Sequence, residues 1–150
     1  MEIKYFDHPN DDFKKLDQMI NDEDFERFGE AALKYVSINT LDGINDFFVV
    51  YENDEAIACG CIKHFKYAPD SIELKRIFVI KPKRRKNIAS AVVEKCEDKA
   101  RELGYKYIVL VTGVDMDEPL GLYKKLGYEY IDNYGPYVGN QVTVCMRKLL

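Results

Sequence analysis

The topology of this protein is set by residues 72–89, IELKRIFVIKPKRRKNIA. Branched and aromatic side chains fill residues 72–80, a composition typical of a β-strand. Pro82 ends this strand, and the basic turn Arg84-Arg85-Lys86 leads into an amphipathic helix that starts near Ile88. The first N–H groups of a helix lack internal partners, and the helix dipole favours negative charge there. The stretch therefore predicts a phosphate site and, with it, a nucleotide-type cofactor.

The helix after the turn is predicted from apolar residues that recur with a period of 3.6. Gly104 suits its C-terminus. A short buried strand at residues 108–111 comes next, and a crossover helix would place it parallel to the 72–80 strand. The apolar face is expected to contain Ile88, Val92, Val93, Cys96, Ala100 and Leu103, and the opposite face Glu94, Lys95, Glu97, Asp98, Lys99 and Arg101.

Similar patterns predict five further strands and three further helices. Asp11 or Asp12 would cap the first of these helices. The polar turn at residues 52–55 joins two strands into a hairpin, and the 72–80 strand extends the same antiparallel meander. Together the elements predict a mixed α/β sheet with helices on both faces. The further strands are residues 2–6, 47–51, 56–65, 128–131 and 142–148, and the further helices are residues 11–20, 24–36 and 119–127. In the second of these helices, the apolar residues are spaced for burial: Phe25, Phe28, Ala32, Leu33 and Val36.

The chain is expected to form one domain, residues 1–150, because it contains no repeat, low-complexity tract or flexible linker. Its composition, 47% hydrophobic and 32% charged, is that of an ordinary soluble protein. No apolar run approaches the length of a membrane span, and residues 1–6 do not resemble a signal peptide. We therefore expect a cytoplasmic protein that does not bind membranes.

The four cysteines, Cys59, Cys61, Cys96 and Cys145, form no C-x-x-C pair and do not cluster with either histidine. This spacing favours small apolar thiols in a reduced core over a redox or metal role. No metal site is predicted.

Charge is distributed unevenly along the chain, whose net charge is −4. Residues 1–60 contain 15 acidic and 5 basic side chains, whereas the remaining residues contain 11 and 17. This division suggests two ligands of opposite charge. The alternative is that the surface charge only keeps the protein in solution.

Several motifs occur in order along the second half of the chain. They are Arg84-Arg85-Lys86-Asn87-Ile88-Ala89 and Leu122-Tyr123-Lys124-Lys125-Leu126-Gly127-Tyr128, with the shorter stretches 58–61, 73–76, 133–137 and 145–148. The first resembles the cofactor motif of the GNAT superfamily of N-acetyltransferases: Arg or Gln, two residues, Gly, one residue, then Gly or Ala. The second is similar to the family's late helix, and the shorter stretches resemble a branch of uncharacterised bacterial members. The resemblance covers about two-thirds of the chain and implies a mixed, mostly antiparallel central sheet of six to seven strands.

Asn87 departs from the family pattern, which usually has Gly at this position and often has Gly at Arg85. Glycine lets backbone amides approach a pyrophosphate without a Cβ in the way. Asn visits left-handed geometry more readily than other non-Gly residues. We therefore expect the turn to keep its amides directed at the pyrophosphate, with a somewhat lower cofactor affinity.

The resemblance implies that acetyl-CoA is the donor, as a co-substrate, and that a primary amine attacks it directly in a ternary complex. A backbone N–H of the 72–80 strand would polarise the thioester carbonyl. The acidic first sixty residues favour a cationic small molecule or a lysine-like peptide amine as acceptor. The family also admits a homodimer. The implied cofactor-binding residues are Ile77, Phe78, Val79, Arg84, Arg85, Lys86, Asn87, Ile88, Ala89 and Ser90.

Two residues are candidates for the catalytic chemistry. Glu73, directly or through a water, would accept the proton of the amine; the alternative is a strand carboxylate paired with Lys75. Tyr123 matches the family tyrosine that protonates the departing thiolate, because its phenol is matched to a thiol; the alternative is a packed aromatic.

Other interpretations stay open at this point. Tyr134, Tyr137 and Asn140 would border the acceptor, or belong to an ordinary turn. The resemblance places Phe25, Phe28 and Tyr35 where the family's first helices wall the acceptor pocket, but a packed core role is preferred for most of them. The basic turn is also compatible with a nucleic-acid patch, but its charge is confined to one turn of an acidic protein, so no nucleic-acid partner is expected. A catalytically silent CoA-binding sensor is the alternative to an enzyme.

Overall fold

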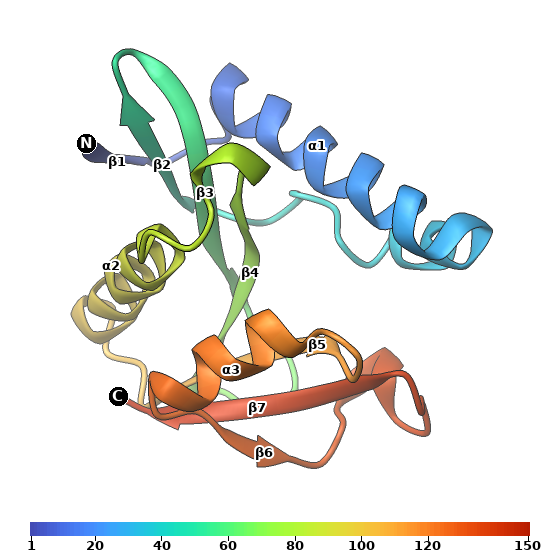
Figure 1. Cartoon of the computed structure of the whole chain (residues 1–150). Coiled ribbons are helices and arrows are strands. Elements are labelled where there is room, and N and C mark those ends of the chain that lie inside the picture. Colours follow the sequence, from blue (N-terminus) through green and yellow to red (C-terminus); the bar gives the residue numbers. More distant parts are fainter.

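The structure is a computed structural model that describes all 150 residues (Figure 1). Three α-helices flank one seven-stranded sheet, in which only β4 and β5 pair in parallel. None of the helices combines the length and the apolar character that crossing a bilayer requires. The strands are β1 (Glu2–Phe6), β2 (Asp46–Glu52), β3 (Glu55–His64), β4 (Ser71–Val79), β5 (Tyr107–Gly113), β6 (Glu129–Ile131) and β7 (Thr143–Leu149), in the order β1-β2-β3-β4-β5-β7-β6, and the helices are α1 (Asp11–Phe28), α2 (Ile88–Glu102) and α3 (Asp117–Lys125).

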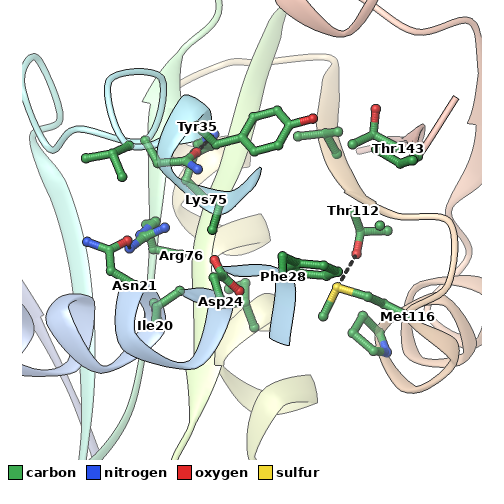
Figure 2. A pocket seen from close by; sticks show the side chains of 18 of the residues that line it. Ile20, Asn21, Asp24, Phe28, Tyr35, Lys75, Arg76, Thr112, Met116 and Thr143 are labelled. Carbon is green, nitrogen blue, oxygen red and sulfur yellow. Dashed lines mark hydrogen bonds between the residues drawn. The ribbon is translucent and has the colours of Figure 1, made fainter. Parts of the chain in front are cut away.

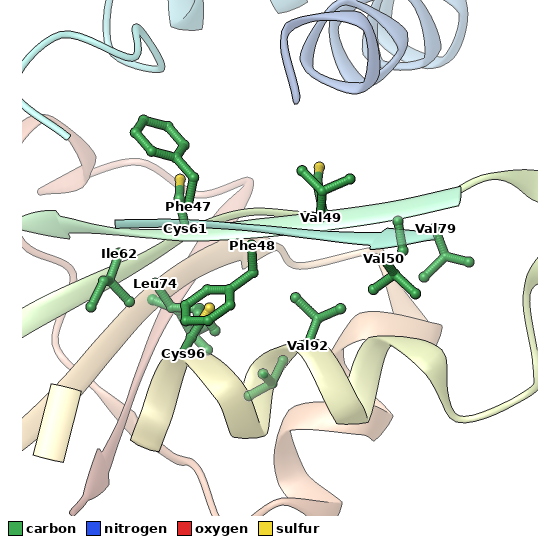
Figure 3. Close-up of a cluster of buried hydrophobic side chains, with 14 of the residues drawn as sticks. Phe47, Phe48, Val49, Val50, Cys61, Ile62, Leu74, Val79, Val92 and Cys96 are labelled. Carbon is green, nitrogen blue, oxygen red and sulfur yellow. The ribbon is translucent and has the colours of Figure 1, made fainter. Parts of the chain in front are cut away.

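The alternation of side chains along β2 and β3 produces a core on both faces of the sheet (Figure 3). Phe47 and Val49 point toward α1, and the Phe47 ring meets Phe13 of that helix with 4.8 Å between centroids. Phe48 and Val50 point the other way, toward Val92 of α2. The predicted sheet with helices on both faces is confirmed.

A β-bulge on β4 interrupts its pairing with β3 at the centre of the sheet. The register between β3 and β4 shifts at Gly60, and Arg76 opposite the shift has a left-handed backbone with φ of +58°. A Cβ on Gly60 would lie 2.5 Å from Ile77 Cδ1 and 2.6 Å from Val92 Cγ1, so a larger residue would require these side chains to move. Pairing between β4 and β5 ends at Glu73 and Val109. From Leu74 onward, β4 therefore has no strand partner on its β5 side.

The N-terminal helices differ from the prediction. One helix, α1, runs through residues 21–24, where two helices were expected to be separated, because no Gly or Pro interrupts the backbone there. Its N-cap is Asn10, whose side chain accepts from the N–H of Phe13, so neither Asp11 nor Asp12 is the cap. Gly29, with φ of +61°, ends the helix, and a 3-10 helix follows at Gly29–Tyr35.

The apolar side chains of this region are not buried as expected. Phe25 is 50% exposed, and Phe28, Leu33 and Val36 are exposed to a similar extent. Phe25 and Phe28 belong to α1, whereas Leu33 and Val36 belong to the 3-10 helix and the residue after it. These side chains instead line a cavity, described below.

Glu97 was expected on the solvent face of α2 but is buried. Its carboxylate accepts hydrogen bonds from the Tyr128 hydroxyl at 2.8 Å and from Lys148 Nζ at 3.0 Å. Lys148 belongs to β7, which reaches α2 only in the folded chain. Leu103, expected on the apolar face, is exposed at the helix end. The remaining predicted apolar residues of α2, Ile88, Val92, Val93, Cys96 and Ala100, are buried.

Candidate active site

Two adjoining cavities lie at the divergence of β4 and β5. The turn cavity, about 580 Å³, is lined by the end of β4, the basic turn, the start of α2 and α3. The α1 cavity, about 730 Å³, is lined by α1, the 3-10 helix, β4, β5 and the start of β7 (Figure 2). The two meet at shared lining residues: Ile20, Asp24, Ile77, Asp115, Met116, Pro119 and Tyr123.

The turn cavity brings together nine of the ten residues predicted to bind a cofactor; Lys86 alone does not line it. Asn87 directly precedes α2 with φ of +61° and ψ of +19°, the left-handed geometry expected of this position. Arg85 is also left-handed, with φ of +66°. Both positions where the family prefers Gly therefore require a positive φ. The first residues of α2, whose N–H groups have no acceptor within the helix, line this cavity.

The basic turn carries less free charge than its sequence indicates. Arg84 donates to the carbonyl oxygen of Val79 and to Glu23 of α1, both at 2.8 Å. Arg85 pairs with Glu118 of α3 at 3.0 Å, and both side chains are exposed. Ion pairs with these acidic neighbours therefore stabilise the turn and offset part of its positive charge. The backbone amides are its main groups for binding an anion.

Tyr123 lies where the two cavities meet. The helix α3 presents its side chain to both, and the residue is only 8% exposed. Its ring also packs edge-to-face on Tyr128, with 5.5 Å between centroids, so the packed-aromatic interpretation describes part of its environment. Burial raises the pKa of the Tyr123 hydroxyl above its usual value. The phenol is therefore a proton donor, and not a base, across physiological pH.

Glu73 lines neither cavity. It is buried on β4 between Lys63 of β3 and Val109 of β5, and its carboxylate accepts a hydrogen bond from the Tyr134 hydroxyl at 2.7 Å. Burial, and then the Glu73 charge, raise the pKa of Tyr134. The alternative pairing of Glu73 with Lys75 does not form, because Lys75 Nζ donates to Asn39 Oδ1 at 2.7 Å. The catalytic role of Glu73 stays a prediction.

The residues suggested to border an acceptor separate into two groups. Tyr137 lines the α1 cavity, whereas Tyr134 and Asn140 do not. Asn140 Nδ2 donates to the Tyr35 hydroxyl at 2.7 Å, which joins the loop before β7 to the 3-10 helix. Phe25, Phe28 and Tyr35, expected in the core, all line the α1 cavity instead.

Six charged residues line the α1 cavity, and none of them was assigned to it from the sequence; three of the six, Asp24, Lys75 and Arg76, are buried or partly buried. The Arg76 guanidinium binds Asp17 at 2.6 Å and Asn21 at 2.7 Å, which fastens β4 to α1. A basic pair in a strand rich in branched and aromatic residues was the available signal for Lys75 and Arg76. Asp24 had no such signal, since it is one of many acidic residues in α1.

The sequence comparisons agree on one family. The model of the acetyltransferase (GNAT) family matches residues 9–128. An IAA acetyltransferase of Azospirillum brasilense is 32% identical over 108 residues, which cover 69% of this chain and 67% of that protein. Across the curated relatives that it matches, the chain spans between 47% and 69% of their length.

Solved structures agree in fold. An acetyltransferase of the GNAT family from Staphylococcus aureus matches with a TM-score of 0.74 at 17% identity, covering 99% of each chain. A GNAT family acetyltransferase from Elizabethkingia anophelis, solved with acetyl-CoA bound, matches with a TM-score of 0.66 at 19% identity, covering 81% of this chain and 85% of the other. Because the family model spans most of the chain, including the turn, α2 and Tyr123, the protein belongs to the GNAT family of acetyltransferases.

Proposed function

We propose that the protein transfers an acetyl group from acetyl-CoA to a primary amine, by direct attack within a ternary complex. One observation carries this proposal: a cavity formed by left-handed Asn87, the first amides of α2 and the unpaired edge of β4 opens into a second cavity at Tyr123. The Elizabethkingia anophelis neighbour was solved with acetyl-CoA bound, which supports the same donor for this chain.

Each part of the turn cavity has a role in this proposal. The amides of residues 87–90 bind the diphosphate of the donor, where the helix dipole favours negative charge. The free backbone of Ile77-Phe78-Val79 hydrogen-bonds the pantetheine arm, and an N–H of β4 stabilises negative charge on the thioester oxygen. Tyr123 donates a proton to the departing thiolate. Glu73 lines neither cavity and is bound by the Tyr134 hydroxyl, so its role as proton acceptor would use water or Tyr134 as the relay.

The acceptor amine enters from the α1 cavity. Asp22 and Asp24 belong to the acidic first sixty residues and line this cavity, which supports a cationic acceptor group such as a lysine-like amine. A cytoplasmic location and a homodimer stay predictions from the sequence.

The proposal is tested by measuring free thiol released from acetyl-CoA in the presence of a mixed panel of amines. Release that requires an amine is expected, and omission of the amine is the control. A protein that binds coenzyme A in calorimetry but never releases thiol with any amine would instead be the CoA-binding sensor. A folded protein that does not bind coenzyme A or acetyl-CoA would contradict both functions.

Asn87→Gly is expected to tighten coenzyme A binding by about two- to fivefold, because it removes a Cβ beside the diphosphate and keeps a positive φ without strain. Isothermal titration calorimetry measures the change. Asn87→Ala is the matched control, and it should weaken binding, because alanine tolerates φ of +61° poorly. An affinity that stays equal or falls in Asn87→Gly would show that the Asn87 side chain itself contributes to binding.

A further inference from the structure

The α1 cavity contains two charges of opposite sign that the protein leaves without an ionic partner. Asp24 reaches the cavity from α1, is partly buried, and makes no side-chain hydrogen bond or ion pair within the chain. Lys75 reaches it from β4, is 7% exposed, and donates a single hydrogen bond, to the neutral Asn39. Figure 2 shows the two side chains at the same cavity.

The other charges of the cavity are already compensated. Arg76 is bound by Asp17. Asp22, Lys34 and Asp115 are exposed, so water screens their charge. Asp24 and Lys75 are also not paired with each other, because no nitrogen–oxygen contact within 4.0 Å joins them. They therefore remain as two separate, complementary positions.

The α1 cavity contains donors that an anion needs, with Lys75 as the charged one. An ammonium group has three N–H donors, and only one of those of Lys75 is used within the chain. Thr143 Oγ1 lines the same cavity, is buried, and has no hydrogen-bond partner. The Tyr35 hydroxyl accepts from Asn140, so its own proton is available, and Figure 2 shows it directed toward Thr143. Buried polar groups without partners are costly, and a bound carboxylate would satisfy them.

The position of Asp24 is suited to an ammonium group. Burial raises the pKa of its carboxyl, and nearby Arg76 opposes this rise only in part. A partly desolvated carboxylate gains from a cation that enters the cavity. Asp24, like Tyr123, lines both cavities, whereas Lys75 lines the α1 cavity only.

We infer that the acceptor is an amino carboxylate, a free amino acid or a related ω-amino acid, whose ammonium binds at Asp24 and whose carboxylate binds at Lys75. This inference rests on the proposed function and narrows its acceptor class. It orients the amine toward Tyr123 and the thioester. The exposed rings of Phe25 and Phe28 provide apolar walls for the carbon chain between the two charges. A diamine is disfavoured, because its second ammonium would approach Lys75.

The test compares amines that differ only in the carboxylate. Thiol release is measured with α- and ω-amino acids of increasing length, each beside its carboxamide, and with L-lysine, L-lysinamide and cadaverine as one matched set. The wild-type protein is expected to prefer the carboxylates by roughly ten- to hundredfold in kcat/KM, the range for a hydrogen-bonded charged group. Lys75→Met should abolish most of this preference, and Lys75→Arg should retain part of it.

Three further measurements make the result specific. Lys34→Met removes the same charge from an exposed position at the cavity mouth, and the preference should change less than about twofold there. Thr143→Val removes one neutral donor, and it should lower kcat/KM for the amino acids roughly threefold while sparing the carboxamides. It also replaces Lys75→Met as the test if that variant fails to fold. Coenzyme A affinity, measured by calorimetry, should not change in any variant, because neither Lys75 nor Thr143 lines the turn cavity.

Two outcomes overturn the inference. Carboxamides or diamines used as efficiently as the amino acids would remove the carboxylate from recognition and leave the acetyltransferase function intact. An equal effect of Lys75→Met on both classes of amine would assign Lys75 a structural role only. Binding of coenzyme A without thiol release for any amine would, by contrast, be the failure of the proposed function.

Discussion

Replacing Tyr123 with phenylalanine is expected to lower kcat about a hundredfold, the lower end of the range for a positioned general acid. The hydroxyl is the only group removed, and it lies at the junction of the two cavities on a residue that is 8% exposed. Burial raises the pKa of this hydroxyl, so it carries its proton throughout the neutral range and donates it to the thiolate. Thiol-release kinetics with a saturating amine measure the change.

Two controls separate this role from packing. Coenzyme A affinity should stay within about twofold, because the ring that packs on Tyr128 is retained. Tyr130→Phe removes a hydroxyl from a side chain that is 52% exposed and outside both cavities, and its kcat should equal that of the wild type. Unchanged turnover in a folded Tyr123→Phe variant would remove Tyr123 from the mechanism. The packed-aromatic interpretation would then account for the residue.

Arg76→Met is expected to lower the free energy of unfolding by about 3 kcal/mol, the lower end of the range for breaking a buried ion pair from one side. The Arg76 side chain is 5% exposed and binds Asp17 at 2.6 Å, the backbone oxygen of Asp17 at 3.1 Å and Asn21 at 2.7 Å. Methionine preserves the aliphatic volume but leaves a carboxylate and an amide without their partner. Urea unfolding followed by circular dichroism measures the difference.

A double-mutant cycle tests whether the ion pair is responsible. Asp17→Asn combined with Arg76→Met should cost less than the sum of the single changes, because the unpaired carboxylate is then absent. Arg101→Met is the surface control: its partner Asp98 is exposed, so the change should stay within about 0.5 kcal/mol. Additive effects of the Arg76 and Asp17 substitutions would contradict a stabilising ion pair between β4 and α1. They would point to backbone strain at Arg76 instead.

Local chemistry accounts for most of the predicted fold. The β2–β3 hairpin follows from its polar turn, where Asn53 and Asp54 both adopt positive φ. The parallel pairing of β4 with β5 follows from the helix between them. The expected break between two N-terminal helices was wrong, because residues 21–24 contain no helix-breaking residue and the helix continues through them. The burial of Glu97 could not be predicted, because its partners come from residues 128 and 148.

The candidate site likewise has one part that local sequence predicts and one part that it does not. The turn before α2 is continuous in the chain, and residues 77–90 supply nine of the residues that line the turn cavity as predicted. The acceptor side is discontinuous. Asp24 and Lys75 lie fifty-one positions apart, and nothing in the pattern around either residue indicates the other.

The order of strands and helices, and the left-handed turn that faces the proposed diphosphate, were encoded within short segments of the chain, because periodicity, turn propensity and helix termini act over a few residues. The pairing of α1 with β4, the exposure of the Phe25 and Phe28 side chains to a cavity and the isolation of the Asp24 and Lys75 charges arose from packing between distant segments. Burial and charge compensation depend on which groups approach one another through space, and a linear pattern does not specify those distances.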